Sequence, residues 1–277
     1  NSRYCYLDPF IGAQIAVAEA CRNVTCSGAT PIALTDCLNF ANPERPEIYL
    51  QLEESIQGMS LAAQSFNTPI VSGNASLYNQ SDHSEIYPTP VIGCIGVMSN
   101  SIIPTTSGFT DIGLEVLVLG TDHLELNKES LSGSEYYSLL YGSVSGKPHI
   151  DLNLEVKVQN LCRDLISGQL VLSAHDCSEG GLIIALAECC AIGDIGFTGS
   201  DVTLNNWESA LFGESQSRII VSCDNSSTDE IFKRASSHGV PIIRIGTTTT
   251  GDFTFGNEVR LSLAEISQAW NSTLPRK

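Results

Sequence analysis

The stretch TPIVSGNASLYNQS, residues 68–81, joins a short apolar run to a polar cluster that an ordinary buried strand does not carry. The apolar run favours a strand, and the Gly, Asn and Ser residues behind it favour a turn. The same residues also suit a binding site, because Gly73 lets a ligand approach the backbone closely. Asn74 beside it offers an amide oxygen, which Mg²⁺ accepts as a ligand. A turn and a binding site are the two interpretations that this stretch leaves open.

Helix and strand patterns alternate on both sides of this stretch. Helical patterns cover residues 11–24 and 46–66, and the second begins with Pro46, a residue favoured in a first helical turn. One strand pattern ends at Asp36, and another covers residues 89–98. Strands and helices that alternate in this way predict an α/β unit over roughly the first 100 residues.

A connector rich in Ser, Thr, Pro and Gly, residues 99–113, precedes a second run of strands and helices. We therefore predict two domains, residues 1–104 and residues 105–277, and an α/β (α+β) fold class. The patterns of the second domain predict strands at 114–120, within 170–181, at 217–223 and at 240–248, and helices at 130–142, 152–168, 182–193 and 227–239.

The composition describes a globular protein, since 42% of the 277 residues are hydrophobic and 16% are charged. No apolar run of roughly 18 residues occurs, so we expect no membrane span. The formal net charge of −17, without a basic stripe to offset it, argues against a nucleic-acid partner. A phosphorylated ligand would therefore need backbone N–H groups, a divalent metal and a few local basic residues.

The ten cysteines and five Asn-x-Ser/Thr sequons permit two interpretations of the cellular compartment. An even cysteine count together with sequons is typical of secreted, disulfide-bonded proteins. Several cysteines, however, stand where small apolar core residues would, as in ALAECCAIG, residues 185–193. We recognise no signal peptide and no CxxC pair with zinc spacing. We therefore expect reduced thiols, unused sequons and a cytoplasmic protein.

Two oxygen-bearing side chains follow neighbouring predicted strands that one crossover helix separates. Asp36 ends the first strand, and Asn74 follows the next one. Because equivalent ends of parallel strands are neighbours in a sheet, we expect the two oxygens to converge where Mg²⁺ could bind. The alternative is an aspartate that caps the next segment and an asparagine in a turn. The spacing alone leaves both interpretations open.

A second polar group stands in SAHDCSEGGL, residues 173–182. A strand delivers Asp176, and Ser178 with two glycines opens a helix whose free N–H groups attract anions. Ser178 as a simple N-cap is the alternative. His175 beside Asp176 has the composition of a catalytic dyad, but neighbours in a strand point to opposite faces. We therefore do not expect a proton relay at His175.

Glu19 and Asn23 form a weaker candidate, one turn apart on the first helix. Exposed polar pairs at this spacing are common, so the pair matters only if Asp176 joins it as another Mg²⁺ oxygen. The Gly-Glu-Ser turn at residues 213–215 precedes a strand and could line a cleft. We assign no chemistry to that turn.

The ordered motifs of the chain resemble the C-terminal half of phosphoribosylformylglycinamidine synthase (formylglycinamide ribonucleotide amidotransferase) in its small form, synthetase subunit II. The resemblance rests on DPFIGAQIAVAEACRNVTCSGATPIALTDCLNFANPERPEIYLQLEESIQGM (8–59), TPIVSGNASLYN (68–79), IYPTPVIGCIGVM (86–98) and HDCSEGGLIIALAE (175–188). Aminoimidazole ribonucleotide synthetase, selenophosphate synthetase and thiamine-phosphate kinase share the two-domain plan. The pair LTDCLNF and VSGNASLYN favours the amidotransferase over these other members.

This resemblance implies an ATP-dependent carbon–nitrogen ligase of purine biosynthesis. The implied reaction converts the formyl amide of formylglycinamide ribonucleotide to an amidine with glutamine-derived ammonia, and ATP and Mg²⁺ are the implied cofactors. The implied fold has an N-terminal domain that forms half of a barrel-like sheet and a layered C-terminal α/β domain. The implied partners are the missing N-terminal half, a glutaminase subunit and a small accessory subunit.

The resemblance also implies roles for single residues. Asp36 and Gly73 match ATP-binding positions of the family. Asn74 matches a Mg²⁺ ligand, and Ser76 matches a position that touches the ribonucleotide substrate. The large form has a second, structural nucleotide–Mg²⁺ site, and the residues that match it are Glu19, Asn23, Asp176 and Ser178. We expect no catalytic residue in this half, because His175 does not match the family's catalytic His.

Three hypotheses about function follow. The leading one is that the chain supplies part of the ligase site and is inactive alone. The alternatives are a structural nucleotide-binding half-module that is never catalytic, and another member of the same superfamily. A self-sufficient homodimeric enzyme is disfavoured, because the metal-binding carboxylates of the family lie in the missing half. Since half of a barrel exposes its sheet, we predict that the chain self-associates or needs that half.

Overall fold

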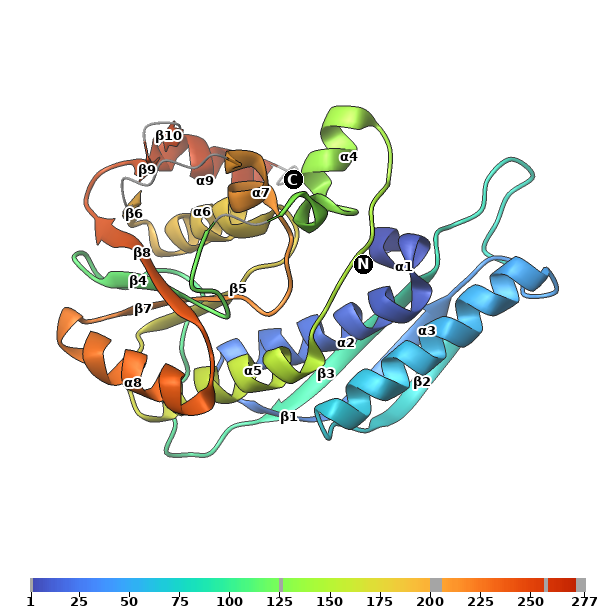
Figure 1. Cartoon of the computed structure of the whole chain (residues 1–277), viewed down its shortest axis with the longest axis horizontal. Helices are drawn as coiled ribbons and strands as arrows, with labels where there is room; N and C mark the ends of the chain where they lie inside the picture. Colours follow the sequence, from blue (N-terminus) through green and yellow to red (C-terminus); the bar gives the residue numbers. More distant parts are fainter. Residues whose placement is uncertain (1, 125–126, 200–205, 257–258, 273–277) are drawn as a thin grey trace.

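Two β-sheets organise the chain, one of three strands and one of seven (Figure 1). The structure is a computed structural model, and it describes residues 2–124, 127–199, 206–256 and 259–272. No helix within these ranges is both long enough and apolar enough to cross a membrane.

The three-stranded sheet has the order β2-β1-β3. Its central strand β1 (Thr30–Asn39) runs parallel to β2 (Ile70–Ser76) and antiparallel to β3 (Thr89–Val97). A parallel neighbour requires a crossover connection, and α3 (Pro46–Ser65) supplies it. The helix α2 (Pro9–Cys26) lies beside α3 on the same face of the sheet (Figure 1).

Helices cover one face of this sheet and leave the other open. Leu34 and Leu38 of β1 are buried among residues of α2 and α3. On the opposite face, Val91 and Ile95 of β3 are 53% and 58% exposed. Side chains alternate between the faces of a strand, so the odd-numbered residues of β1 from 33 onward belong to the open face. The short α1 (Ser2–Leu7) precedes α2.

The seven-stranded sheet has the order β10-β9-β6-β8-β4-β7-β5. Its interior strand β4 (Glu115–Leu119) is antiparallel to both neighbours, β7 (Ile219–Cys223) and β8 (Ile242–Thr249). The remaining strands are β5 (Ser173–Asp176), β6 (Gly196–Gly199), β9 (Phe253–Phe255) and β10 (Val259–Leu261).

Helices cover both faces of the larger sheet (Figure 1). Alternate residues of β4 enter two separate cores, as the two-residue period of a strand requires. One core includes α6 (Gly181–Gly193) and α9 (Leu263–Ser272), and the other includes α5 (Leu152–Ser167) and α8 (Thr228–His238). The short helices are α4 (Glu135–Tyr141), α7 (Trp207–Phe212) and the 3₁₀ turns η1 (Lys128–Leu131) and η2 (Asn225–Ser227). Layers of helix and sheet confirm the predicted α/β class.

The predicted long elements agree with the structure, and the differences concern their ends. Pro46 is the first residue of α3, as predicted. Gly168 is the C-cap of α5 in a right-handed conformation, and the next residue, Gln169, adopts the positive φ of 53°. The predicted helix at 130–142 is divided into η1 and α4, with Gly133 at a φ of 67° between them. The sequence patterns missed the short elements α1, β6, α7, β9, β10 and α9.

The predicted boundary after residue 104 falls between β3, which ends at Val97, and β4, which begins at Glu115. The two sheets are joined by more than this connector, since α2 packs against α5 and β5 of the second unit. The division into residues 1–104 and 105–277 therefore stays a prediction.

Candidate functional site

Six side chains with hydroxyl, thiol or amide groups line the open face of the three-stranded sheet. We call this set the polar strip, and its members are Thr35, Cys37 and Asn39 of β1 and Ser72, Asn74 and Ser76 of β2. The register pairs Thr35 with Ser72, Cys37 with Asn74 and Asn39 with Ser76. Residues paired across two strands point to the same face, so the strip is continuous over both strands.

Hydrogen bonds within the strip orient its side chains. Ser72 Oγ donates to Thr35 Oγ1 at 2.8 Å, and Asn74 Nδ2 lies 3.6 Å from Cys37 Sγ. Because the nitrogen of the Asn74 amide takes the thiol contact, its oxygen is the end that can bind a cation. Behind the strip, Asn79 Nδ2 donates to the carbonyl of Ser76 at 2.7 Å and holds the turn after β2. Asn79 Nδ2 also donates to Ser76 Oγ at 3.1 Å, so the strip presents Asn74 to solvent and leaves Ser76 half-buried.

Asp36 and Asn74 do not converge, so the expected oxygen pair is wrong. Asp36 is paired with Gly73, and Asn74 is paired with Cys37. Adjacent residues of a strand point to opposite faces. Asp36 thus lies on the helix-covered face with Leu34 and Leu38, while Asn74 lies on the open face.

An irregularity in the pairing of β2 causes this separation. Leu34 is paired with Ile70, but the next residue, Thr35, is paired with Ser72, so Val71 is an extra residue in β2. If the pairing continued one residue to one residue from Leu34 and Ile70, Asn74 would be opposite Leu38 and would share the face of Asp36. One inserted residue moves every later side chain of the strand to the other face.

The second group of candidates lies around Arg22, a residue that the sequence analysis did not single out. Arg22 is fully buried, and its Nη1 donates to Glu155 Oε1 at 2.8 Å. Its Nη2 donates to Gln216 Oε1 at 3.2 Å, and its Nε lies 3.6 Å from Asp176 Oδ2. Arg22 therefore connects α2 with α5 and β5. A charged residue in the apolar run IAVAEACRNV was the signal in the sequence, because such a residue needs buried partners.

The predicted second nucleotide set is only partly brought together. Burial raises the pKa of Glu19, Arg22 counters part of this rise, and the charge of Asp176 adds to it. Glu19 and Asp176 therefore lie within electrostatic range of each other, with Arg22 beside both. Asn23 is exposed, and Ser178 uses its carbonyl to accept the N–H of Gly181 at 3.1 Å.

His175 makes contacts that the alternation of strand side chains did not predict. Its Nε2 lies 2.9 Å from Glu188 Oε2 of α6, and its Nδ1 lies 3.6 Å from Asp176 Oδ1. Burial opposes protonation of the imidazole, but Asp176 and Glu188 outweigh it and raise the pKa of His175 to about 9. Burial would raise the pKa of Asp176, yet His175 and Arg22 hold it below its usual value. A protonated His175 between two carboxylates is a structural ion cluster.

The start of α6 is occupied by an internal carboxylate. Gly180 is the N-cap with a φ of 81°, so the alternative of Ser178 as N-cap is wrong. The N–H of Gly180 donates to Glu214 Oε1 at 2.8 Å, and the N–H of Glu135 donates to the same oxygen at 2.8 Å. The other oxygen of Glu214 accepts the hydroxyl of Tyr4. Glu214 lies in the Gly-Glu-Ser turn at residues 213–215, and its carboxylate connects α1, α4 and α6 through hydrogen bonds.

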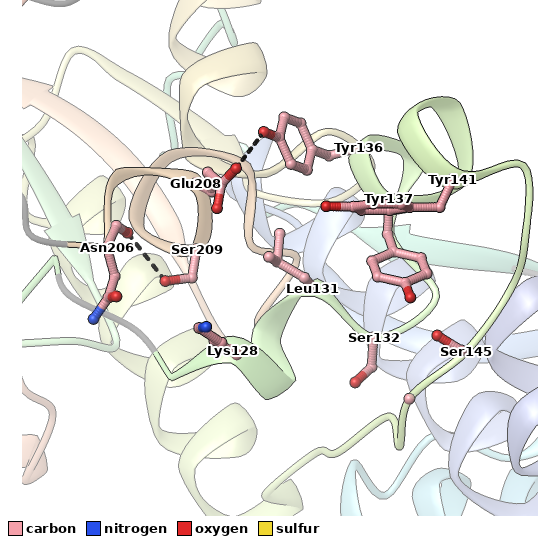
Figure 2. Close-up of a pocket in the computed structure, with 11 residues that line it drawn as sticks. Lys128, Leu131, Ser132, Tyr136, Tyr137, Tyr141, Ser145, Asn206, Glu208 and Ser209 are labelled. Atoms are coloured by element: carbon pink, nitrogen blue, oxygen red, sulfur yellow. Dashed lines mark hydrogen bonds between the residues drawn. The ribbon is translucent and has the colours of Figure 1, made fainter.

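Two cavities lie away from the polar strip, and one of them reaches the surroundings of Arg22 through Gln216. One of about 220 Å³ lies between α4 and α7, where the hydroxyl of Tyr136 donates to Glu208 Oε1 at 2.9 Å (Figure 2). Another of about 380 Å³ is lined by Lys147, His149 and Glu214 among others. Neither cavity is lined by a residue of the polar strip. The strip is an open surface of the three-stranded sheet.

Two protein-family models match the chain, one for each of its two sheets. The model of the AIR synthase-related N-terminal domain matches residues 1–98, and that of the corresponding C-terminal domain matches residues 111–256. The chain therefore belongs to the AIR synthase-related family.

Curated relatives are more specific. The chain is 45% identical to the phosphoribosylformylglycinamidine synthase subunit PurL of Thermomicrobium roseum, over 99% of this chain and 37% of that protein. It is 42% identical to the PurL subunit of Caldanaerobacter subterraneus, with the same two shares. These relatives confirm the resemblance to the synthase, and the chain spans 37% of their length.

Solved structures confirm the fold. The structure of Thermotoga maritima PurL complexed with FGAR has a TM-score of 0.76 and 18% identity, over 96% of this chain and 44% of that one. The same protein complexed with ATP has a TM-score of 0.70, with 94% and 42% covered. A chain of the HypE–HypF complex has a TM-score of 0.67 at 15% identity, with 90% and 83% covered.

Proposed function

We propose that this chain is the C-terminal half of an ATP-dependent ligase that converts formylglycinamide ribonucleotide to its amidine. In this reaction ATP phosphorylates the formyl amide oxygen, and ammonia then displaces the phosphate to form the new carbon–nitrogen bond. The observation that supports the proposal is the polar strip, in which Asn74 is exposed and Ser76 is half-buried on the same open face of the sheet. The 45% identity to a PurL subunit supports it.

In this proposal the open face of the three-stranded sheet is a shared active-site wall. Ser76 offers a hydroxyl to the ribonucleotide, and Gly73 of the same strand has no side chain to cover its backbone. Asp36 lies on the other face of the sheet, where its carboxylate contacts β2 at Gly73. We therefore assign Asp36 a role in packing β1 against β2, and we do not assign it to the metal that Asn74 would bind. The missing N-terminal half would cover this face, and a glutaminase subunit with a small accessory subunit would deliver ammonia.

Mg²⁺ fits this wall only in part. The described residues contain no group of three or more His, Cys, Asp or Glu side chains that could hold a metal ion. The chain therefore supplies one amide oxygen, from Asn74, and the other ligands would be phosphate oxygens, water and residues of the missing half. Bound Mg²⁺ would neutralise charge on the transferred phosphate.

The proposal is tested with the Asn74→Ala variant and with Asn100→Ala, an exposed asparagine of the connector, as its matched control. In a complete enzyme that contains the missing half, we expect Asn74→Ala to lower turnover at least about tenfold, because the phosphate loses an oriented metal ligand. Asn100→Ala should match the parent.

Equal turnover of Asn74→Ala and the parent would remove the catalytic assignment. It would favour the alternative of a structural nucleotide-binding module. A Ser76→Ala variant separates the two ligands, because we expect it to raise the KM for the ribonucleotide more than that for ATP.

A further inference from the structure

The surroundings of Asp176 and the start of α6 have residue types that suit a second nucleotide with Mg²⁺. Asp176 offers carboxylate oxygens, Glu19 lies within electrostatic range of it, and the start of α6 offers N–H groups. Such a ligand needs two positions, one for a cation beside the carboxylates and one for phosphate at the helix start. Side chains of this chain already occupy both positions.

Arg22 and His175 face both oxygens of the Asp176 carboxylate. Arg22 Nε lies 3.6 Å from Oδ2, and His175 Nδ1 lies 3.6 Å from Oδ1. A Mg²⁺ ion must approach its oxygen ligands to about 2.1 Å, which these two groups obstruct. Arg22 Nε and Asp176 Oδ2 are buried without a hydrogen bond, and they face each other, so each satisfies the charge of the other.

The guanidinium of Arg22 is a permanent cation at this position. Burial alone would lower the pKa of Arg22, but the carboxylates of Glu155 and Asp176 raise it, so the side chain stays charged. The short bond to Glu155 and the bond to Gln216 fix the guanidinium from two other directions. Unlike a metal ion, this cation cannot dissociate from the fold.

The carboxylate of Glu214 is the matching anion. It is 5% exposed, and one of its oxygens accepts the N–H groups of Gly180 and Glu135. The N–H of Gly180 is the N-cap group of α6, and a phosphate at the start of α6 would have to displace Glu214 from it. Glu135 is the first residue of α4, so Glu214 also joins the starts of the two helices. Tyr4 donates to the other oxygen and keeps the carboxylate in place.

We propose that Arg22 and Glu214 are built-in replacements for the cation and the phosphate of a second nucleotide. This half of the protein is closed at that position and binds neither Mg²⁺ nor ATP there. Arg22 instead locks α2, and with it the sheet that carries the polar strip, onto α5 and β5. The residues of the large-form site therefore do not hold a nucleotide in this chain. This inference does not depend on the activity proposed for the polar strip.

The cation position is tested by titrating Mn²⁺, followed by electron paramagnetic resonance, in the Asn74→Ala background, where the polar strip lacks its metal ligand. In the Asn74→Ala protein, which is the parent of this comparison, we expect no Mn²⁺ binding that depends on Asp176. An added Asp176→Asn change should therefore leave its Mn²⁺ titration unchanged. We expect an added Arg22→Ala change to bind Mn²⁺ at least about tenfold more tightly, because Glu155 and Asp176 then lack their cation. Arg163→Ala, a change at a half-buried arginine of α5 that donates to Thr25 Oγ1 at 2.9 Å, is the matched control.

Either of two results would overturn the proposal. One is Mn²⁺ binding to the Asn74→Ala parent that Asp176→Asn abolishes, which would show that the cation position is open. The other is a folded Arg22→Ala variant that gains no Asp176-dependent binding. If Arg22→Ala does not fold, Arg22→Gln takes its place, because glutamine keeps a polar side chain and removes the charge.

The anion position is tested with inorganic phosphate as the probe. We expect phosphate to raise the unfolding midpoint of Glu214→Ala by about 2 °C or more, because the N–H groups of Gly180 and Glu135 become available. The parent should not respond in this way. A response of the parent that equals that of the variant would contradict the role of Glu214.

Discussion

The carboxylate of Asp36 fills the space into which any residue larger than glycine at position 73 would place its side chain. A Cβ atom at Gly73 would lie 1.6 Å from Asp36 Oδ1. The glycine is therefore required by a neighbouring side chain within the sheet, and no turn is involved. This contact also fixes which face of the sheet Asn74 occupies.

The Gly73→Ala change should destabilise the protein by about 1–3 kcal/mol, because the half-buried Asp36 carboxylate must leave its place beside β2. Urea unfolding measures the difference. Gly251→Ala is the control, since the nearest atom to a Cβ there is 3.8 Å away. Equal stability of the two variants would show that the carboxylate at position 36 moves freely.

Stability should fall as the pH rises from about 6.5 to 9, because His175 is protonated between Asp176 and Glu188. The pKa of about 9 lies above the unfolded value of about 6.5, so the folded state holds the proton more tightly. The stabilisation is therefore complete below pH 6.5 and is lost as the pH passes through 9. We expect a loss on the order of 1–3 kcal/mol in urea unfolding, and a flatter profile for His175→Gln. An identical profile for parent and variant would contradict the assignment.

Removing the hydroxyl of Tyr4 should cost about 1–2 kcal/mol. Burial and the charge of Glu214 raise the pKa of Tyr4 well above its usual value, so the phenol stays protonated and donates to the buried carboxylate. Tyr4→Phe leaves that oxygen of Glu214 without its donor. Tyr6→Phe is the matched control, because Tyr6 is 48% exposed on the same helix. Thermal or urea unfolding that ranks the two variants equally would refute this role.

The open face of the three-stranded sheet should drive self-association of the isolated chain. Val91 and Ile95 are apolar and more than half exposed on this face. Changing both to lysine should shift the sedimentation profile towards monomer, while Leu139→Lys, at an exposed leucine of α4, should not. If the unchanged chain sediments as a compact monomer, the open face of the sheet does not drive self-association.

Thiol titration should find two reactive cysteines in the folded protein and ten after unfolding without a reductant. All ten cysteines are free, and eight are buried, while Cys37 and Cys94 are partly exposed. Fewer than ten thiols after unfolding would indicate disulfides and revive the secreted interpretation. Removal of Cys37 by Cys37→Ser should reduce the fast-reacting number to one.

Sequence patterns allowed the long elements to be predicted, because α2, α3 and α5 each bury part of their surface and four of the five residues of β4 are apolar. The short elements were not predictable in the same way. β9 has three residues, too few to carry a period, and it exists because β6 and β10 pair with it.

The amino-acid sequence alone determined the α/β class, the glycine at position 73 and the polar composition of the 72–76 segment. Only the tertiary structure decided which of those polar residues act together. A one-residue irregularity at Val71 moves Asn74 to the open face and leaves Asp36 under the helices. The physical reason is the two-residue period of a strand, which makes the face of each side chain depend on the pairing register. Arg22 and Glu214 likewise acquired their roles from partners more than 30 positions away in the chain.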